Sequence, residues 1–196
     1  MKLILDFEVG GGERYYNSKL KAPCWPGASS GVTVGIGYDL GYKSASQIRN
    51  DWSKHLPSWK VNKLVEVSGV KGRKALDLLW RTRGIEIDWD AALEVYKEKT
   101  IPRFIATTLR AFPGADLLHP SAFGALVSLV FNRGGSVNGS RRSEMLAIRG
   151  LVPKKDYSGM ARKIREMKRL WSKSKLRGLH RRRDAEANLI DSAAGL

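Results

Sequence analysis

The sequence predicts an α+β fold, a mostly helical chain with one small β-containing lobe. The segment Val32-Thr33-Val34-Gly35-Ile36-Gly37-Tyr38 alternates with a period of two and is rich in β-branched residues, which is typical of a strand. Most of the remaining chain has apolar residues at helical spacing. We expect a single domain, with the small lobe over about 10–42, the helical lobe over 1–9 and 43–196, and a ligand cleft between them.

The helices are predicted from their start and stop signals. Residues 1–9 form a short helix ended by three glycines, and residues 13–42 are rich in turn signals. Ser44 and Gln47 fit a capping box that begins a helix to about Leu56. Further helices are expected over 58–67, 72–80, 88–112 with Asp88 as N-cap and a break at Pro102, 121–132 after Pro120, 143–149, 160–171 and 178–191. Residues 122–131 are apolar almost all round, so they should form the central buried helix of the helical lobe.

Charge and composition limit the possible partners and cofactors. The chain has 35 Lys and Arg against 19 Asp and Glu, a formal charge of +16, which predicts a polyanionic partner such as nucleic acid, anionic lipid or a wall polymer. The single cysteine, Cys24, excludes an internal disulfide and a cysteine-based zinc site, and we expect no metal or other cofactor. The N-terminus lacks the apolar core of a signal peptide, so synthesis in the cytoplasm is expected.

Three residues suggest acid–base chemistry. Glu8 lies at the end of the first predicted helix, where the negative end of the helix dipole favours the protonated form that a general acid needs. Thr33 and Asp39 are expected on one face of the strand, where a hydroxyl beside a carboxylate can hold and activate water. A carboxylic acid and a carboxylate on two sides of a cleft suit glycoside hydrolysis. The alternatives are a solvated glutamate at a helix end and a hairpin with a turn aspartate.

The motifs around these residues resemble a known family. Two segments resemble the catalytic core of phage-type lysozymes, closest to the pesticin-like branch. The first is Phe7-Glu8 with Gly10-Gly11, and the second is Ser30-Gly31-Val32-Thr33-Val34-Gly35-Ile36-Gly37-Tyr38-Asp39-Leu40-Gly41. Residues 125–134 resemble the buried helix and Asn-x-Gly turn of that family, and residues 178–186 its C-terminal Gly-Leu-x-x-Arg-Arg-x-x-Glu helix. The resemblance implies a lysozyme-like fold with a small β-hairpin lobe and a catalytic cleft between the lobes.

The resemblance also implies an activity. It implies a muramidase that cleaves the β-1,4 bond between N-acetylmuramic acid and N-acetylglucosamine in peptidoglycan. Glu8 is then the general acid, and Asp39 with Thr33 positions water. Commoner members have an aspartate nine residues after the glutamate, where this chain has Asn17, so Asp39 takes the role and Glu13 is the second choice. The usual outcome is inversion, which requires carboxyl groups roughly 6.5–9.5 Å apart.

Other residues have two interpretations each. Tyr15 and Tyr38 either stack on sugar rings or pack inside the β segment. Asn132 either binds an N-acetyl group or caps its helix in a left-handed turn. Arg182 is a candidate substrate-binding residue that could also reach Glu8.

The C-terminal region is strongly basic. Residues 159–183 include eleven basic residues and one acid, with an apolar stripe at Met160, Ile164, Met167 and Trp171. This pattern indicates either a core-facing helix with a solvated basic face or a docking surface for anionic wall polymer or outer-membrane lipid.

The sequence as a whole therefore predicts a bacteriolytic phage endolysin. It would be a monomer made in the host cytoplasm and acting on cell-wall peptidoglycan after release, with no specific nucleic-acid partner. Two rivals stay open. A lytic transglycosylase would need Glu8 alone, and a non-catalytic cationic protein would bind membranes or nucleic acid.

Overall fold

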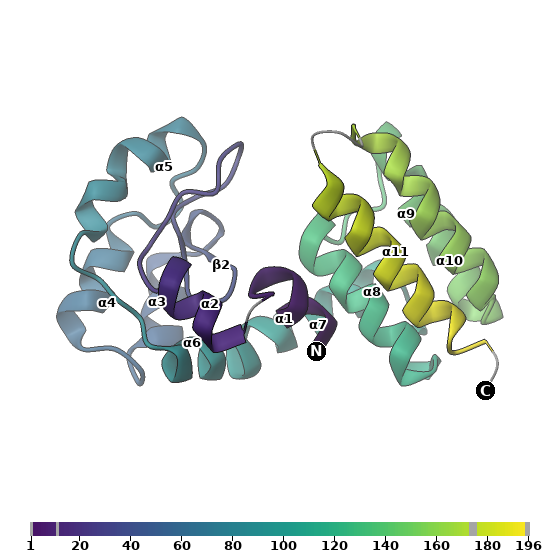
Figure 1. Cartoon of the computed structure of the whole chain (residues 1–196), viewed down its shortest axis with the longest axis horizontal. Helices are drawn as coiled ribbons and strands as arrows, with labels where there is room; N and C mark the ends of the chain where they lie inside the picture. The colour runs from purple at the N-terminus through teal and green to yellow at the C-terminus, as the bar shows by residue number, and fades with distance from the viewer. Residues whose placement is uncertain (1, 11, 173–175, 195–196) are drawn as a thin grey trace. The chain divides into compact units, whose positions relative to one another are not determined.

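The computed structural model describes residues 2–10, 12–172 and 176–194. The chain divides into two compact units, one formed by Glu8–Pro102 and the other by Met1–Phe7 with Arg103–Leu196. We call them the N-terminal unit and the C-terminal unit; Figure 1 shows the helices of each. The first unit thus extends well beyond the lobe expected over about 10–42, because four helices after the β segment pack with it.

The N-terminal unit combines short helices with one hairpin. Its elements are α2 (Gly12–Lys19), β1 (Thr33–Val34), β2 (Tyr38–Asp39), α3 (Ala45–Trp52), α4 (Ser58–Val65), α5 (Arg73–Leu78) and α6 (Trp89–Val95). The helix α1 (Lys2–Glu8) ends at the first residue of this unit. The predicted mixture of many helices and little sheet is therefore confirmed.

The helix α2 corrects the expectation of turns from residue 13 onward. Glu13 in the first turn and Lys19 in the last turn both complement the helix dipole. The Tyr16 side chain is fully buried, and its hydroxyl donates a hydrogen bond of 2.9 Å to the carbonyl of Ile87. A helix this short is marginal alone, so this distant contact explains why local signals did not predict it.

The β segment is a hairpin and not the single strand expected over 32–38. β1 and β2 are antiparallel, and the turn between them contains Gly35 at φ +56° and Gly37 at φ +65°. Backbone with positive φ is accessible to glycine at little cost, so these two glycines allow the chain to reverse. Residues 32–38 alternate with a period of two even across the turn, so the sequence pattern did not indicate that the chain reverses there.

The predicted helix start at Ser44 is confirmed. The Ser44 hydroxyl accepts a hydrogen bond from the Gln47 backbone N–H at 3.2 Å, and the Gln47 side chain accepts one from the Ser44 N–H at 3.0 Å. This reciprocal pair satisfies two backbone donors that would otherwise lack partners at the start of α3.

The long segment expected over 88–112 is interrupted as predicted, slightly before the proline. α6 follows Asp88, a π-helical turn spans Tyr96–Thr100, and α7 spans Ile101–Ala111. Because Pro102 has no N–H and its ring crowds the preceding turn, the regular α-helical hydrogen bonds cannot continue through it.

The C-terminal unit is a helical bundle. It contains α8 (Pro120–Arg133), α9 (Ser143–Leu151), α10 (Tyr157–Glu166) and α11 (Arg177–Asp191) (Figure 1). Seven residues of α8 are buried, five of them in the hydrophobic core that these helices share, which confirms its predicted central position. No helix among the described residues is long and apolar enough to cross a membrane.

The basic C-terminal region has an apolar side that faces the core. Met160, Ile164 and Met167 are fully buried, as the stripe predicted. Several of its cations contact acids on neighbouring helices, as in Arg165–Asp191 at 2.7 Å and Lys168–Asp184 at 2.6 Å. Lys173 and Lys175 lie outside the described residues.

Candidate active site

The hairpin brings Thr33 and Asp39 directly opposite each other. They are Cα partners in the antiparallel register of β1 and β2. Opposed residues in an antiparallel pair project to the same face, with their side chains close together. The hydroxyl and the carboxylate therefore share a face as expected, although they do so across two strands and not along one.

The backbone orients the Asp39 carboxylate. Its Oδ1 accepts hydrogen bonds from the Gly41 N–H at 2.8 Å and the Gly31 N–H at 3.0 Å. Its Oδ2 lies 3.2 Å from the same Gly31 nitrogen. A carboxylate has about four acceptor positions, so Oδ2 retains capacity to accept a hydrogen bond from water.

Asp39 is a stronger base than an ordinary aspartate. Partial burial raises the pKa of Asp39, and this effect exceeds the opposing effects of the Gly41 and Gly31 N–H groups and of Lys43 and Lys71. A raised pKa brings a carboxylate closer to the range in which it accepts a proton efficiently near neutral pH.

The Thr33 backbone pairs with Cys24 through both its N–H and its carbonyl group. Its N–H donates to the Cys24 carbonyl at 2.8 Å, and its carbonyl accepts from the Cys24 N–H at 3.0 Å. The Thr33 hydroxyl donates to the Gly31 carbonyl over a long distance of 3.5 Å. That hydroxyl is half-buried and weakly engaged, so it can donate to a nearby water.

Gly31 leaves no room for a side chain beside Asp39. A Cβ at Gly31 would lie 2.5 Å from the Asp39 Oδ1 and closer still to the Gly41 nitrogen. We expect Gly31→Ala to displace the carboxylate, to lower the free energy of unfolding by about 1–3 kcal/mol and to reduce activity. Urea unfolding and an activity assay measure both effects. Gly150→Ala, where nothing lies within 4 Å, is the matched control, and equal behaviour of the two variants would contradict this expectation.

The two other carboxylates in question occupy different surroundings. Glu8 is the last residue of α1, is half-buried, and belongs to the same compact unit as Thr33 and Asp39. Glu13 is exposed in the first turn of α2, where its carboxylate accepts from the Asn17 side chain at 3.5 Å. A helix N-terminus favours an ionised acid, so Glu13 has a structural explanation.

The two candidate stacking tyrosines differ in exposure. Tyr15 on α2 is 44% exposed. Tyr38 is 2% exposed, packs edge-on against Trp52, and donates a hydrogen bond of 2.6 Å to Asp51. Burial leaves Tyr38 almost no surface for a sugar ring, which favours the packing interpretation for this residue.

Asn132 and Arg182 belong to the C-terminal unit. Asn132 is exposed and lies within α8; the left-handed position at the helix end is Gly134, at φ +75°, so the alternative that Asn132 caps the helix is wrong. Arg182 is buried, donates to Glu186 at 3.3 Å and to the Ser128 carbonyl at 3.4 Å, and lies over the Phe7 ring.

A buried polar cluster joins α8 to α11. Glu186 is fully buried and contacts Ser128 at 2.7 Å, Arg183 at 2.9 Å and Arg182 at 3.3 Å. Burial raises the pKa of Glu186, while these three partners oppose the rise. The spacing of Arg182, Arg183 and Glu186 by three and four residues was visible in the sequence, but only the structure shows that they are buried together.

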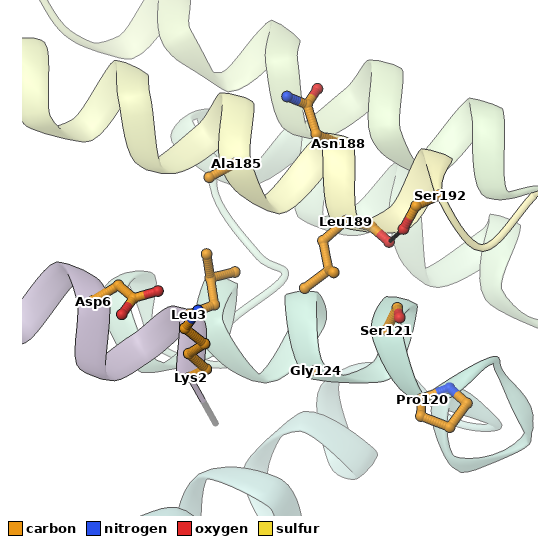
Figure 2. A pocket seen from close by; sticks show the side chains of 10 residues that line it. All are labelled: Lys2, Leu3, Asp6, Pro120, Ser121, Gly124, Ala185, Asn188, Leu189 and Ser192. Carbon is orange, nitrogen blue, oxygen red and sulfur yellow. Dashed lines mark hydrogen bonds between the residues drawn. The ribbon is translucent and has the colours of Figure 1, made fainter.

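A cavity of about 620 Å³ in the C-terminal unit lacks a paired hydroxyl and carboxylate like those of Thr33 and Asp39. Figure 2 shows it lined by residues of α1, α8 and α11 and by Ser192 just after α11: Lys2, Leu3, Asp6, Pro120, Ser121, Gly124, Ala185, Asn188, Leu189 and Ser192. It contains none of the predicted catalytic residues, and its one acid is exposed. We therefore place the candidate active site at the hairpin and not in this cavity.

Two family models match the chain. One, a domain of unknown function (DUF8812), matches residues 3–100, which include Glu8, Thr33 and Asp39. The other, described as phage lysozyme, matches residues 83–186, which include α8 and the buried cluster with Glu186. No curated protein matches the chain. The second match covers more than half of the residues, and the chain therefore belongs to the phage lysozyme family.

Proposed function

We propose that this protein is a muramidase that hydrolyses the β-1,4 bond between N-acetylmuramic acid and N-acetylglucosamine. Membership of the phage lysozyme family implies a glycosidase-type enzyme that acts on peptidoglycan. The observation that supports the specific chemistry is the pairing of Thr33 with Asp39, a hydroxyl beside an oriented carboxylate of raised pKa.

In the proposed mechanism Glu8 protonates the glycosidic oxygen as the bond to the anomeric carbon breaks. Asp39, ionised, accepts a proton from a water that the Thr33 hydroxyl helps to orient. That water attacks the opposite face of the sugar, so the configuration at the anomeric carbon inverts. Glu8 ends ionised and Asp39 protonated, and exchange of both protons with solvent restores the enzyme. The mechanism requires no metal or other cofactor.

We further propose roles for the surrounding residues. Tyr15 and Asn132 are exposed, which is compatible with stacking on a sugar ring and with a hydrogen bond to an N-acetyl group. Tyr38 and Arg182 are buried, so we assign them positioning roles in their units. As a phage endolysin of the pesticin-like branch, the enzyme would act on the wall after release from the host cytoplasm.

The product distinguishes hydrolysis from the transglycosylase alternative. A lytic transglycosylase needs only one acid–base residue and leaves an anhydro-sugar end, whereas hydrolysis adds water and leaves a reducing end. Mass spectrometry of digested peptidoglycan should therefore show products with the mass of one added water. Fragments lighter by one water would contradict the proposed reaction, and no release of fragments would favour the non-catalytic binding alternative.

The second carboxylate is tested by a matched pair of substitutions. We expect Asp39→Asn to reduce the hydrolysis of purified peptidoglycan by about 10²-fold, because an amide cannot accept the proton of water. Glu13→Gln, which removes the same charge from an exposed position of α2, should leave activity close to wild type. The reverse order of activities would transfer the role from Asp39 to Glu13.

The pH profile of the same assay provides a second readout. Only ionised Asp39 is active, so its raised pKa should set the acidic limit of activity above the ordinary aspartate value of 3.8. The raised pKa means that the folded state binds the Asp39 proton more tightly than the unfolded state. This binding stabilises the folded protein at low pH, and the stabilisation is lost as the pH rises through the pKa of Asp39 in the folded state. Loss of activity in acid is thus not explained by unfolding through this group.

A further inference from the structure

Three arginines line a second pocket, in the C-terminal unit, and a fourth, Arg183, lies close to one of its lining residues. This cavity of about 340 Å³ is lined by Asn132, Arg133, Arg141, Arg142, Trp171 and Leu179, all in the C-terminal unit. Arg183 approaches from α11, with its guanidinium 5.9 Å from the Trp171 ring; that of Arg133 lies 5.0 Å from the same ring. Trp171 and Leu179 make part of the wall apolar.

The three arginines that line this pocket make no ion pair with a described acid. Among residues 2–10, 12–172 and 176–194, no carboxylate oxygen lies within 4.0 Å of Arg133, Arg141 or Arg142. The two closest acids have other partners, because Glu144 is ion-paired with Arg169 and Glu186 belongs to the buried cluster. Like charges held together repel one another, and the nearest acids are already paired elsewhere, so an anion among these arginines would be favoured.

The proximity of these arginines affects the ionisation of Arg133. Burial lowers the pKa of Arg133 to about 10, with further lowering by the charges of Arg142, Arg183 and Arg141, while Glu144 opposes the shift. Each of the three neighbouring arginines acts on Arg133 through its positive charge, which means that the four guanidinium groups share one electrostatic environment.

Several N–H donors of the cluster have no acceptor. Arg133 Nε, Arg142 Nη1 and Arg183 Nη1 are buried and make no hydrogen bond in the described part of the chain. Arg183 is fully buried, so its orphaned donor cannot exchange freely with bulk water. Buried unsatisfied donors are costly, and more so on charged groups, so an acceptor that reached Arg133 Nε or Arg142 Nη1 would be favoured.

Three of the four arginines are held in place without any ligand. Arg133 donates through Nη2 to the Arg141 carbonyl at 2.7 Å, and Arg141 donates to the Leu170 carbonyl at 3.2 Å. Arg183 donates to the Asn132 side chain at 3.1 Å. These bonds fix the guanidinium planes and leave other N–H groups for binding, so little ordering is needed when an anion arrives.

We propose that this pocket is a binding site for an oxyanion, a carboxylate or phosphate group carried by a larger molecule. A guanidinium presents paired N–H donors whose spacing matches the two oxygens of such groups. The apolar wall at Trp171 and Leu179 then accommodates the part of the ligand next to the anion. None of the proposed catalytic residues Glu8, Thr33 and Asp39 lines the pocket, whereas Asn132, a proposed substrate-binding residue, does.

The test is a titration of the ¹⁵N-labelled full chain followed by NMR at constant ionic strength. Sodium pyrophosphate and sodium glutarate are the two probes, and the indole N–H of Trp171, assigned with Trp171→Phe, is the reporter. Saturable shifts are expected with at least one probe. A stronger response to glutarate identifies a carboxylate ligand, and a stronger response to pyrophosphate identifies a phosphate ligand.

Two variants localise the binding. Arg142→Gln should weaken the affinity by roughly tenfold or more, because it removes a charged forked donor. Arg149→Gln removes the same charge from an exposed position of α9 outside the pocket and should bind like wild type. If Arg142→Gln does not fold, Arg142→Lys keeps the charge without the fork and should also bind more weakly.

Two results would overturn the site: shifts that never saturate with either probe, or equal affinities in the Arg142 and Arg149 variants. Binding should persist in Glu8→Gln, so failure of the proposed muramidase chemistry and failure of the anion site are separable.

Discussion

Glu8→Gln should reduce the hydrolysis of purified sacculi by at least about 10²-fold, since a general acid typically supplies that much of the rate. Glutamine has nearly the same shape as glutamic acid, but its amide cannot give a proton to the leaving oxygen. Loss of turbidity of a sacculus suspension measures the rate. Far-UV circular dichroism should show an unchanged helical content, because Glu8 is the final residue of α1 and glutamine has nearly the same helix propensity as glutamate.

The matched control for Glu8 lies on the same helix. Asp6→Asn removes one negative charge from an exposed position of α1 and should clear sacculi at close to the wild-type rate. If Glu8→Gln clears sacculi as fast as wild type, Glu8 is not the acid. If that variant loses sacculus hydrolysis but still kills cells, the killing would come from the basic C-terminal helices.

Glu186→Ala should cause the largest loss of stability, about 3–5 kcal/mol in the free energy of unfolding. The substitution removes the carboxylate on which Ser128, Arg182 and Arg183 converge. Arg183 is fully buried, and it would keep its charge in the core without its ion-pair partner. The penalty comes mainly from that uncompensated charge and less from the lost attraction. Urea unfolding followed by circular dichroism measures it.

The control for this prediction is an acid in an exposed ion pair. Glu166 contacts Lys163 at 2.7 Å, and both side chains are accessible to solvent. Glu166→Ala should therefore change stability by less than about 1 kcal/mol. Similar losses in the two variants would mean that the cluster joining α8 to α11 contributes no more than a surface pair does.

Local sequence signals predicted most of the helices because those helices have local causes. The reciprocal bonds of Ser44 and Gln47 depend only on residues three apart, and Pro120 begins α8 through its own restricted backbone. The apolar residues of α8 are nearly continuous, so its burial followed from composition. The expectation of a family fold from three ordered motifs likewise agrees with the phage lysozyme match.

Elements that depend on contacts between residues far apart in the sequence were not predicted. The helix α2 depends on the Tyr16 hydroxyl bond to Ile87, seventy-one residues later. The hairpin turn was concealed because Gly35 and Gly37 fit an alternating pattern as well as they fit a reversal. Arg133, Arg142 and Arg183 form a cluster only because α8, α11 and the segment between α8 and α9 meet in the folded unit.

The amino-acid sequence alone determined which chemical groups are available: a helix-end acid, a hydroxyl six residues before a carboxylate, and an excess of arginine. These features depend only on residue type and on spacings of a few residues, so they can be identified in the sequence itself. Tertiary structure decided which of these groups share an environment. Burial raises the pKa of Asp39, the hairpin register sets Thr33 opposite it, and packing of α8 against α11 leaves arginine donors without acceptors. Each of these depends on distances across the fold, which no local pattern encodes.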